Sequence, residues 1–141
     1  MTLVPKRRLP RAAAAAALLT AATVSLLLSV PAAAKGAMEI TAPGRPLRTG
    51  QALHISGDGD DDAARYLRAC VQERTLGAGA WRTVGCGRTV ASGDGATVET
   101  LVRARRRGAL QLRGVLYGLD APGDAHPDVV RSSAVRMVRI H

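Results

Sequence analysis

The sequence contains no phenylalanine, one tryptophan and two tyrosines. Aromatic side chains bury large areas and dominate most domain cores, so Val, Leu, Ile and Ala must supply most of the burial in this chain. Lysine is scarce as well, because Lys6 and Lys35 are the only two and the other cations are arginine. No segment has the apolar spacing of a sustained amphipathic helix. These absences argue against a helical bundle and predict a small aliphatic core.

Catalytic signatures are absent too. The chain has no H-E-x-x-H, G-x-S-x-G or C-x-x-C sequence, which removes the common signatures of zinc, serine and redox enzymes. The side chains left for such chemistry are scattered along residues 35–141: Glu39, Glu73, Glu99, His54, His126, His141, Ser56, Ser92, Ser132 and Ser133. A paired-carboxylate hydrolase would lack its second acid, and no histidines have zinc-site spacing. We therefore expect no enzyme activity, no cofactor, and no catalytic, cofactor-binding or metal residues.

Residues 1–34 have the three zones of a secretory signal peptide. Four cations precede residue 12, an uncharged run covers residues 12–30, and Pro31 is followed by three alanines that end at Ala34. These alanines give the A-x-A pattern that signal peptidase accepts, so we expect cleavage after Ala34 and a secreted domain at 35–141. The uncharged run of 19 residues approaches the roughly 20 that span a bilayer. An uncleaved membrane anchor is therefore the alternative.

Removing the leader changes the charge on which any partner prediction rests. The leader holds four of the 20 Lys and Arg residues, so 16 remain in residues 35–141 against 11 Asp and Glu. The net charge of +9 for the whole chain thereby falls to +5. About 107 residues fit one domain with a single core. We predict one moderately basic domain.

After the leader, every periodic segment favours a strand. Seven segments alternate or carry short apolar runs: residues 38–41, 52–56, 66–74, 81–90, 96–105, 109–119 and 133–141. Glycine, proline and aspartate clusters separate them, and the acidic stretch 57–62 is expected to end the second strand. Seven short strands with this punctuation predict an all-β fold, a single antiparallel β-sandwich.

The two cysteines fit a hairpin in this sandwich. If residues 66–74 and 81–86 pair about a turn at Ala78, Cys70 lies directly opposite Cys86, at a distance that a disulfide tolerates. An even number of cysteines in an exported domain also favours a disulfide over a redox or metal role. We therefore predict a disulfide within this hairpin.

The same register assigns the hairpin side chains to two faces. The inner face would carry Leu67, Ala69, Val71, Trp81 and Thr83, with Trp81 as the largest core side chain. The outer face would carry Arg68, Cys70, Gln72, Arg74, Arg82, Val84 and Cys86. Together with Arg88, the polar members of the outer face form a candidate surface for a partner.

Part of the chain resembles a known superfold. Residues 69–74 (ACVQER), a glycine turn and residues 81–84 (WRTV) resemble the central hairpin of bacterial immunoglobulin-like or fibronectin-like domains. Residues 132–140 look like the last strand of such domains, with 111–117 as its neighbour. The resemblance implies an immunoglobulin-like sandwich. The chain departs from the antibody pattern because its disulfide would lie within one hairpin instead of joining two sheets. A superfold of this kind hardly constrains function.

The acidic stretch offers one candidate metal site. Carboxylates at Asp58, Asp60, Asp61 and Asp62 could hold Ca²⁺ with help from Asp94 or Asp120, and a solvated turn is the alternative. An EF-hand loop starting at Asp58 is excluded, because Ala63 and Ala69 stand where it needs glycine and glutamate.

Arginines form the densest charged patch, at Arg103, Arg105, Arg106 and Arg107. Guanidinium forks suit phosphate, sulfate and carboxylate, so an anionic polymer of the cell envelope is the natural ligand. A solvated hairpin tip is the alternative. Nucleic acid fits poorly, because the aromatic platforms that bind single strands are nearly absent.

Two functional hypotheses follow. The first is a secreted, non-enzymatic binding module that contacts a protein or an anionic envelope polymer, with contact to a membrane only if the leader is retained. The second is a small protease inhibitor, in which a disulfide-braced loop at residues 76–80 or 121–127 enters a protease cleft.

Overall fold

The computed structural model describes residues 36–141, and the predicted signal peptide at 1–34 lies outside the described residues. Nine strands cover most of this part of the chain: β1 (Ala37–Thr41), β2 (Ala52–Asp60), β3 (Tyr66–Thr75), β4 (Ala78–Cys86), β5 (Val90–Ala91), β6 (Ala96–Arg103), β7 (Gly108–Leu119), β8 (Asp128–Ser132) and β9 (Arg136–Ile140). Residues 36–141 contain no helix. Accordingly, a helix able to cross a membrane is not found in the described part of the chain.

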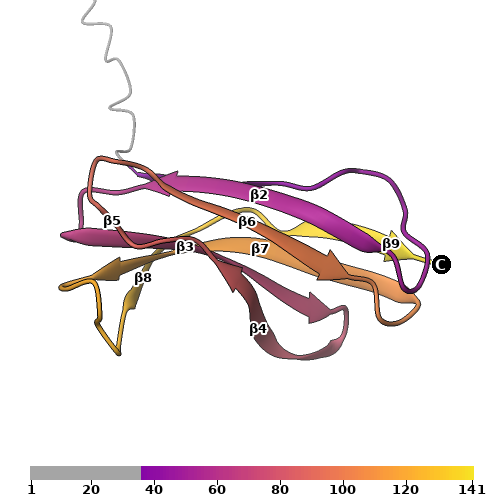
Figure 1. Ribbon diagram of the computed structural model, residues 1–141. Coiled ribbons are helices and arrows are strands. Elements are labelled where there is room, and N and C mark those ends of the chain that lie inside the picture. The colour runs from indigo at the N-terminus through magenta and orange to yellow at the C-terminus, as the bar shows by residue number, and fades with distance from the viewer. Residues whose placement is uncertain (1–35) are drawn as a thin grey trace, which may run out of the picture. The chain divides into compact units, whose positions relative to one another are not determined.

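The strands form two antiparallel sheets that face each other (Figure 1). The small sheet has the order β1-β2-β6. The large sheet has the order β4-β3-β7-β8, with β5 beside β3 and β9 beside β7. The first two strands thus share a sheet with the sixth, and the third strand lies between the fourth and the seventh in the other sheet, as in immunoglobulin-like domains. The predicted sandwich is confirmed, with nine strands in place of seven.

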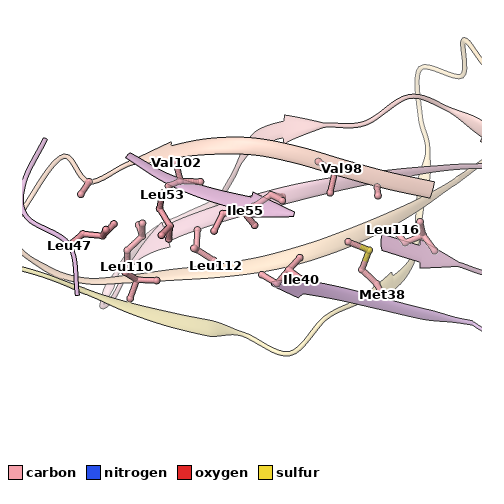
Figure 2. Close-up of a cluster of buried hydrophobic side chains, with 14 of the residues drawn as sticks. Met38, Ile40, Leu47, Leu53, Ile55, Val98, Val102, Leu110, Leu112 and Leu116 are labelled. Carbon is pink, nitrogen blue, oxygen red and sulfur yellow. The ribbon is translucent and has the colours of Figure 1, made fainter. Parts of the chain in front are cut away.

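An aliphatic core fills the space between the sheets (Figure 2). Alternate residues of each strand point into it, as period-two alternation requires. Its fully buried side chains include Leu53 and Ile55 from β2, Val98 from β6, and Leu112 and Leu116 from β7. The chain's tryptophan and both tyrosines lie outside this cluster. The core therefore consists of aliphatic and sulfur-containing side chains only.

The acidic stretch does not end the second strand, as the sequence had suggested. β2 continues to Asp60 and pairs with β1 along its last five residues. Gly57 and Gly59 alternate with Asp58 and Asp60, and the glycines lie on the inner side against Met38. The aspartates therefore point to solvent from a regular strand. The prediction from alternating apolar residues missed this extension of β2, because glycine has no apolar side chain to continue the pattern.

The predicted last strand at 133–141 corresponds to β9, which is shorter than predicted, and the separate strand β8 that precedes it was not predicted from the sequence. β8 and β9 both pair with β7, and residues 133–135 separate them. The Ser133 hydroxyl accepts a hydrogen bond from the Gly114 amide at 2.8 Å, and the Ser133 amide donates to the Gly114 carbonyl at 2.9 Å. The single long strand β7 thus holds both segments at one edge of the large sheet.

The predicted hairpin disulfide is confirmed. Cys70 on β3 pairs with Cys86 on β4, with their Cα atoms 4.0 Å apart. Cys70 is buried and Cys86 is exposed, so the bond lies on the outer side of the large sheet. It joins the edge strand β4 to the central strand β3.

The predicted faces of β4 are partly wrong, because the strand contains a bulge. The register changes from Val71↔Gly85 to Gln72↔Thr83, so Val84 is an extra residue. One extra residue turns all preceding side chains to the opposite face. Val84 packs against the core, Trp81 and Thr83 lie on the outer face, and Arg82 lies on the inner face. The inner positions of Leu67, Ala69 and Val71 on β3 are as predicted.

Two glycines at the end of β4 allow the sheets to touch. A Cβ atom at Gly85 would overlap the Thr100 side chain of β6, and one at Gly87 would overlap the Thr97 carbonyl oxygen. A flexible side chain can move away, but a backbone carbonyl within a strand cannot. Gly87 is therefore the position at which any larger residue would separate β4 from β6.

We predict that Gly87→Ala lowers the free energy of unfolding by about 3 kcal/mol, because the methyl group forces the backbone of β6 to shift. Urea unfolding measures this loss. Gly123→Ala is the control, because a Cβ atom there has open space, and it should change stability by less than about 0.5 kcal/mol. Equal effects of the two substitutions would contradict the close approach.

We also predict that the double substitution Cys70→Ala and Cys86→Ala lowers the free energy of unfolding by roughly 3 kcal/mol. The disulfide that it removes joins residues with a sequence separation of 16, and it restricts the unfolded chain. Urea unfolding of the variant and of the reduced wild-type protein should give similar midpoints. A variant as stable as the oxidised protein would show that the disulfide contributes nothing to stability.

Candidate anion-binding site

The predicted arginine patch lies in the connection from β6 to β7. Arg103 ends β6, and Arg105, Arg106 and Arg107 follow in the loop, all exposed. Ala104 between them is fully buried, and its amide donates to the Gln51 carbonyl at 2.8 Å. The loop is thus fixed at its first residue while the next three side chains point outward.

These arginines border a cavity of about 310 Å³ at the end of the sandwich. The opposite wall is the β3–β4 hairpin, which contributes Glu73, Arg74 and Arg82. The cavity thus lies between the end of β6 with its following loop and this hairpin. Sequence reasoning had placed Arg82 on the outer face, and the bulge in β4 brings it to this inner position.

The charges lining the cavity are strongly unbalanced. Its basic lining residues are Arg74, Arg82, Arg103, Arg105, Arg106 and Arg107, of which Arg74 has its guanidinium group over Trp81. Its one carboxylate is Glu73, which forms an ion pair with Arg82. Arg103 uses Nη1 to donate to the Gly50 carbonyl at 3.0 Å. The cavity wall therefore presents an excess of guanidinium groups to any ligand that enters.

Carboxylates are concentrated at the other end of the sandwich. All eight aspartates lie where β2 and β7 end and where β6 begins: Asp58, Asp60, Asp61, Asp62, Asp94, Asp120, Asp124 and Asp128. The arginine loop lies where β6 ends and β7 begins. Because the strands are antiparallel, these two sets are a full strand length apart. The aspartates therefore do not neutralise the arginine cavity at short range.

Asp60 and Asp61 of the acidic stretch form structural contacts. Asp61 is 3% exposed, accepts from the Ala63 amide at 2.7 Å, and pairs with Arg131 at 2.5 Å. Asp60 Oδ1 accepts from the amides of Asp61 and Gly93. Within residues 36–141, no group of three or more His, Cys, Asp or Glu side chains is arranged to hold a metal. The predicted calcium role of Asp58–Asp62 has no support from this geometry.

The outer face of the large sheet carries a second group of arginines. Of the surface predicted there, Arg68, Gln72 and Arg74 lie on this face by their register with β7. Arg88 is exposed in the connection from β4 to β5, apart from them. Sequence reasoning missed four further members: Trp81, Gln111, Arg113 and Tyr117. The alternation of Gln111, Arg113 and Tyr117 along β7 was the signal that could have identified three of them.

These outer side chains form a connected network. Arg74 Nε donates to Gln111 Oε1 at 2.6 Å, and Arg113 Nε donates to Gln72 Oε1 at 2.9 Å. Both guanidinium groups lie over the Trp81 ring, at 4.4 Å and 4.3 Å from its centroid. We call Arg74, Trp81 and Arg113 with the two glutamines the arginine–tryptophan cluster. Its side chains come from three adjacent strands, β4, β3 and β7.

The scattered candidates of the sequence are not brought together. His54 lies 3.9 Å from Glu99 on the small sheet, and both side chains are exposed. His126 lies in the connection from β7 to β8, and His141 follows β9. The hydroxyl of Ser92 donates to the Asp61 carbonyl at 2.8 Å, at the aspartate end. Apart from the exposed His54 and Glu99, these side chains thus lie at different places among residues 36–141.

The two loops considered for protease inhibition differ from the expected form. β4 starts at Ala78, so only Leu76 and Gly77 connect the hairpin strands. Leu76 is 52% exposed, but a two-residue turn presents no extended segment to a protease cleft. The loop at 121–127 is held internally, because Asp124 accepts hydrogen bonds from the amides of His126 and Asp120 at 2.9 and 3.3 Å. The disulfide does not brace the loop at 121–127, because it lies in the β3–β4 hairpin.

Comparisons with known proteins give no sequence relative. The chain matches no protein-family model and no curated protein sequence. Among solved structures, a CARDB domain from Pyrococcus furiosus in complex with di-metal ions is 7% identical, with a TM-score of 0.47 over 76% of this chain and 88% of that one. A β-glucosidase from Listeria innocua in complex with isofagomine is 14% identical, with a TM-score of 0.47 over 75% of this chain and 16% of the enzyme. The chain thus corresponds to a small part of that enzyme.

We predict an acid-shifted titration for Asp124. The backbone amides of His126 and Asp120 donate to its carboxylate and lower its pKa below the ordinary value of 3.8. Because the pKa is lower in the folded state, the ionised carboxylate stabilises the fold at pH values above the pKa of the unfolded chain. This stabilisation is lost as the pH falls through the pKa of the folded state. Carboxyl carbon shifts in an NMR titration measure it, with a peptide of residues 119–128 as control. Equal pKa values in protein and peptide would contradict the hydrogen bonds.

Proposed function

We propose that this chain is an exported, non-enzymatic binding module that holds an anionic polymer of the cell envelope at the arginine cavity. The single observation that carries the proposal is the cavity wall, where six arginines surround one glutamate that is already paired with Arg82. The hairpin disulfide and the predicted leader support export, because disulfides persist in oxidising compartments.

The chemistry of the cavity favours an anionic ligand. A guanidinium group presents several donors in a planar fork that matches carboxylate, sulfate and phosphate oxygens. A concave site lined by one sign of charge also concentrates the field and raises the local concentration of the opposite charge. The cavity lies at the end of the sandwich, between the β6–β7 loop and the β3–β4 hairpin. Binding should weaken with salt, because the loop arginines are exposed.

We predict that replacing Arg105, Arg106 and Arg107 by serine weakens binding to purified anionic cell-wall polymer about tenfold or more, because three exposed guanidinium groups leave the cavity rim. Co-sedimentation at several salt concentrations measures the affinity. Arg103 is kept, because it also donates to the Gly50 carbonyl.

The matched control replaces Arg45, Arg65 and Arg88 by serine, since these three are exposed and do not line the cavity. This control removes the same charge and should retain most of the affinity. An equal loss in both variants would show that net charge, and not the cavity, holds the polymer. Preferential capture of an acidic protein over the polymer would replace the proposed ligand class.

A further inference from the structure

We propose that the arginine–tryptophan cluster on the outer face of the large sheet is a second, separate binding site, which takes a carboxylate group of an acidic polysaccharide. The inference rests on the proposed function, because it assigns the polymer a chemical class. The two sites share Arg74, but Trp81 and Arg113 do not line the cavity, so the inference can fail independently.

The two guanidinium groups of the cluster are held in place before any ligand arrives. Each has its Nε atom bonded to a glutamine carbonyl oxygen and its plane over the Trp81 ring. Gln72 is itself fixed, because its Nε2 atom donates to the Tyr117 hydroxyl at 3.2 Å and to the Thr83 hydroxyl at 3.4 Å. Gln72 is 8% exposed, so this support lies beneath the surface. A ligand therefore meets arginine side chains whose rotamer entropy is already lost.

The positive charge of the cluster has no counter-ion in the described domain. Both guanidinium carbons lie within 4.4 Å of the same ring centroid, so they are less than twice that distance apart. Neither arginine forms an ion pair with a carboxylate of residues 36–141. Their hydrogen bonds within this part of the chain use Nε, which leaves the terminal nitrogens of both forks as donors. An anion that bridged the forks would relieve their mutual repulsion.

The surroundings of the forks favour a sugar acid over other anions. All three aromatic residues of the chain, Tyr66, Trp81 and Tyr117, lie on this face by register or contact. On this face Val115 and Leu119 are fully buried, and the exposed apolar side chains of Val129 and Met137 lie on β8 and β9, opposite Tyr117 and Gln111. A polyphosphate has no C–H surface to place against the aromatic rings. A sugar carboxylate supplies a planar anion, hydroxyl groups and C–H surface together.

Trp81 makes the site directly observable, because it is the only tryptophan of the chain. We expect digalacturonic acid to change the tryptophan emission of the full protein in a saturable way, while the neutral methyl ester changes it little. Arg113→Gln should weaken this response about tenfold or more, because one fork is lost. Arg113 is chosen because Arg74 also lines the arginine cavity.

Two control variants keep the test interpretable. Arg45→Gln removes the same charge at an exposed position away from the cluster and should leave the emission response unchanged. Arg113→Lys keeps the charge but loses the planar fork, and it should weaken binding nearly as much as Arg113→Gln. If Arg113→Gln unfolds, as judged by circular dichroism, the lysine variant carries the test.

The outcomes separate this site from the arginine cavity. A normal emission response in the variant that has serine at 105, 106 and 107 would support two separate sites, even if polymer sedimentation is lost. A response to digalacturonic acid that Arg113→Gln and Arg113→Lys leave intact would overturn the proposed site. Equal or tighter responses to short polyphosphate or to a glutamate dipeptide would overturn the sugar-acid assignment. No emission change with any anion would reject the site while leaving the arginine cavity untouched.

Discussion

The bulge at Val84 determines where the functional side chains of the β3–β4 hairpin lie. It turns Val84 into the core, Arg82 toward the arginine cavity and Trp81 onto the outer face. Without it, Trp81 would point inward and Arg82 outward, and neither group of arginines would have its present form. Gly85 and Gly87 belong to the same constraint, because they let the bulged strand touch β6. The local irregularity of one edge strand thus positions both candidate sites.

An aliphatic core makes the outer position of the aromatic residues possible. Val, Leu, Ile, Met and Ala fill the space between the sheets, and no described aromatic side chain is needed there. The same strands that bury Leu67, Ala69 and Val71 inward carry Arg68, Gln72 and Arg74 outward. Period-two alternation therefore places the core side chains on one face of β3 and the side chains of the proposed second site on the other. The disulfide braces this arrangement by tying the edge strand to the centre of the sheet.

The features that could be predicted from the sequence depend on residues close together in the chain, and those that could not depend on contacts between distant residues. Alternation and turn residues were enough to predict the sandwich, and hairpin register was enough to pair Cys70 with Cys86. The bulge could not be predicted in this way, because counting back from the cysteine pair assumes one residue opposite another along the whole hairpin, and the register changes at Val84. The Gly-Asp alternation at 57–60 was misread as a turn, although its glycines pack under Met38. The arginine loop was visible as a charge run, but its opposite wall required the corrected face of Arg82.

Arg74 links the two groups of arginines. Its guanidinium group lies over Trp81 on the outer face, and its side chain also lines the arginine cavity. The hairpin edge between them has no carboxylate other than Glu73, which Arg82 already neutralises. A polymer that extended from the cavity across this hairpin edge would therefore reach the arginines of the arginine–tryptophan cluster first. The aspartates lie at the far end of the strands. Two sites on one chain would raise the effective concentration of the polymer at each of them. Their separation around one strand edge thus favours an extended anionic polymer over a single small anion.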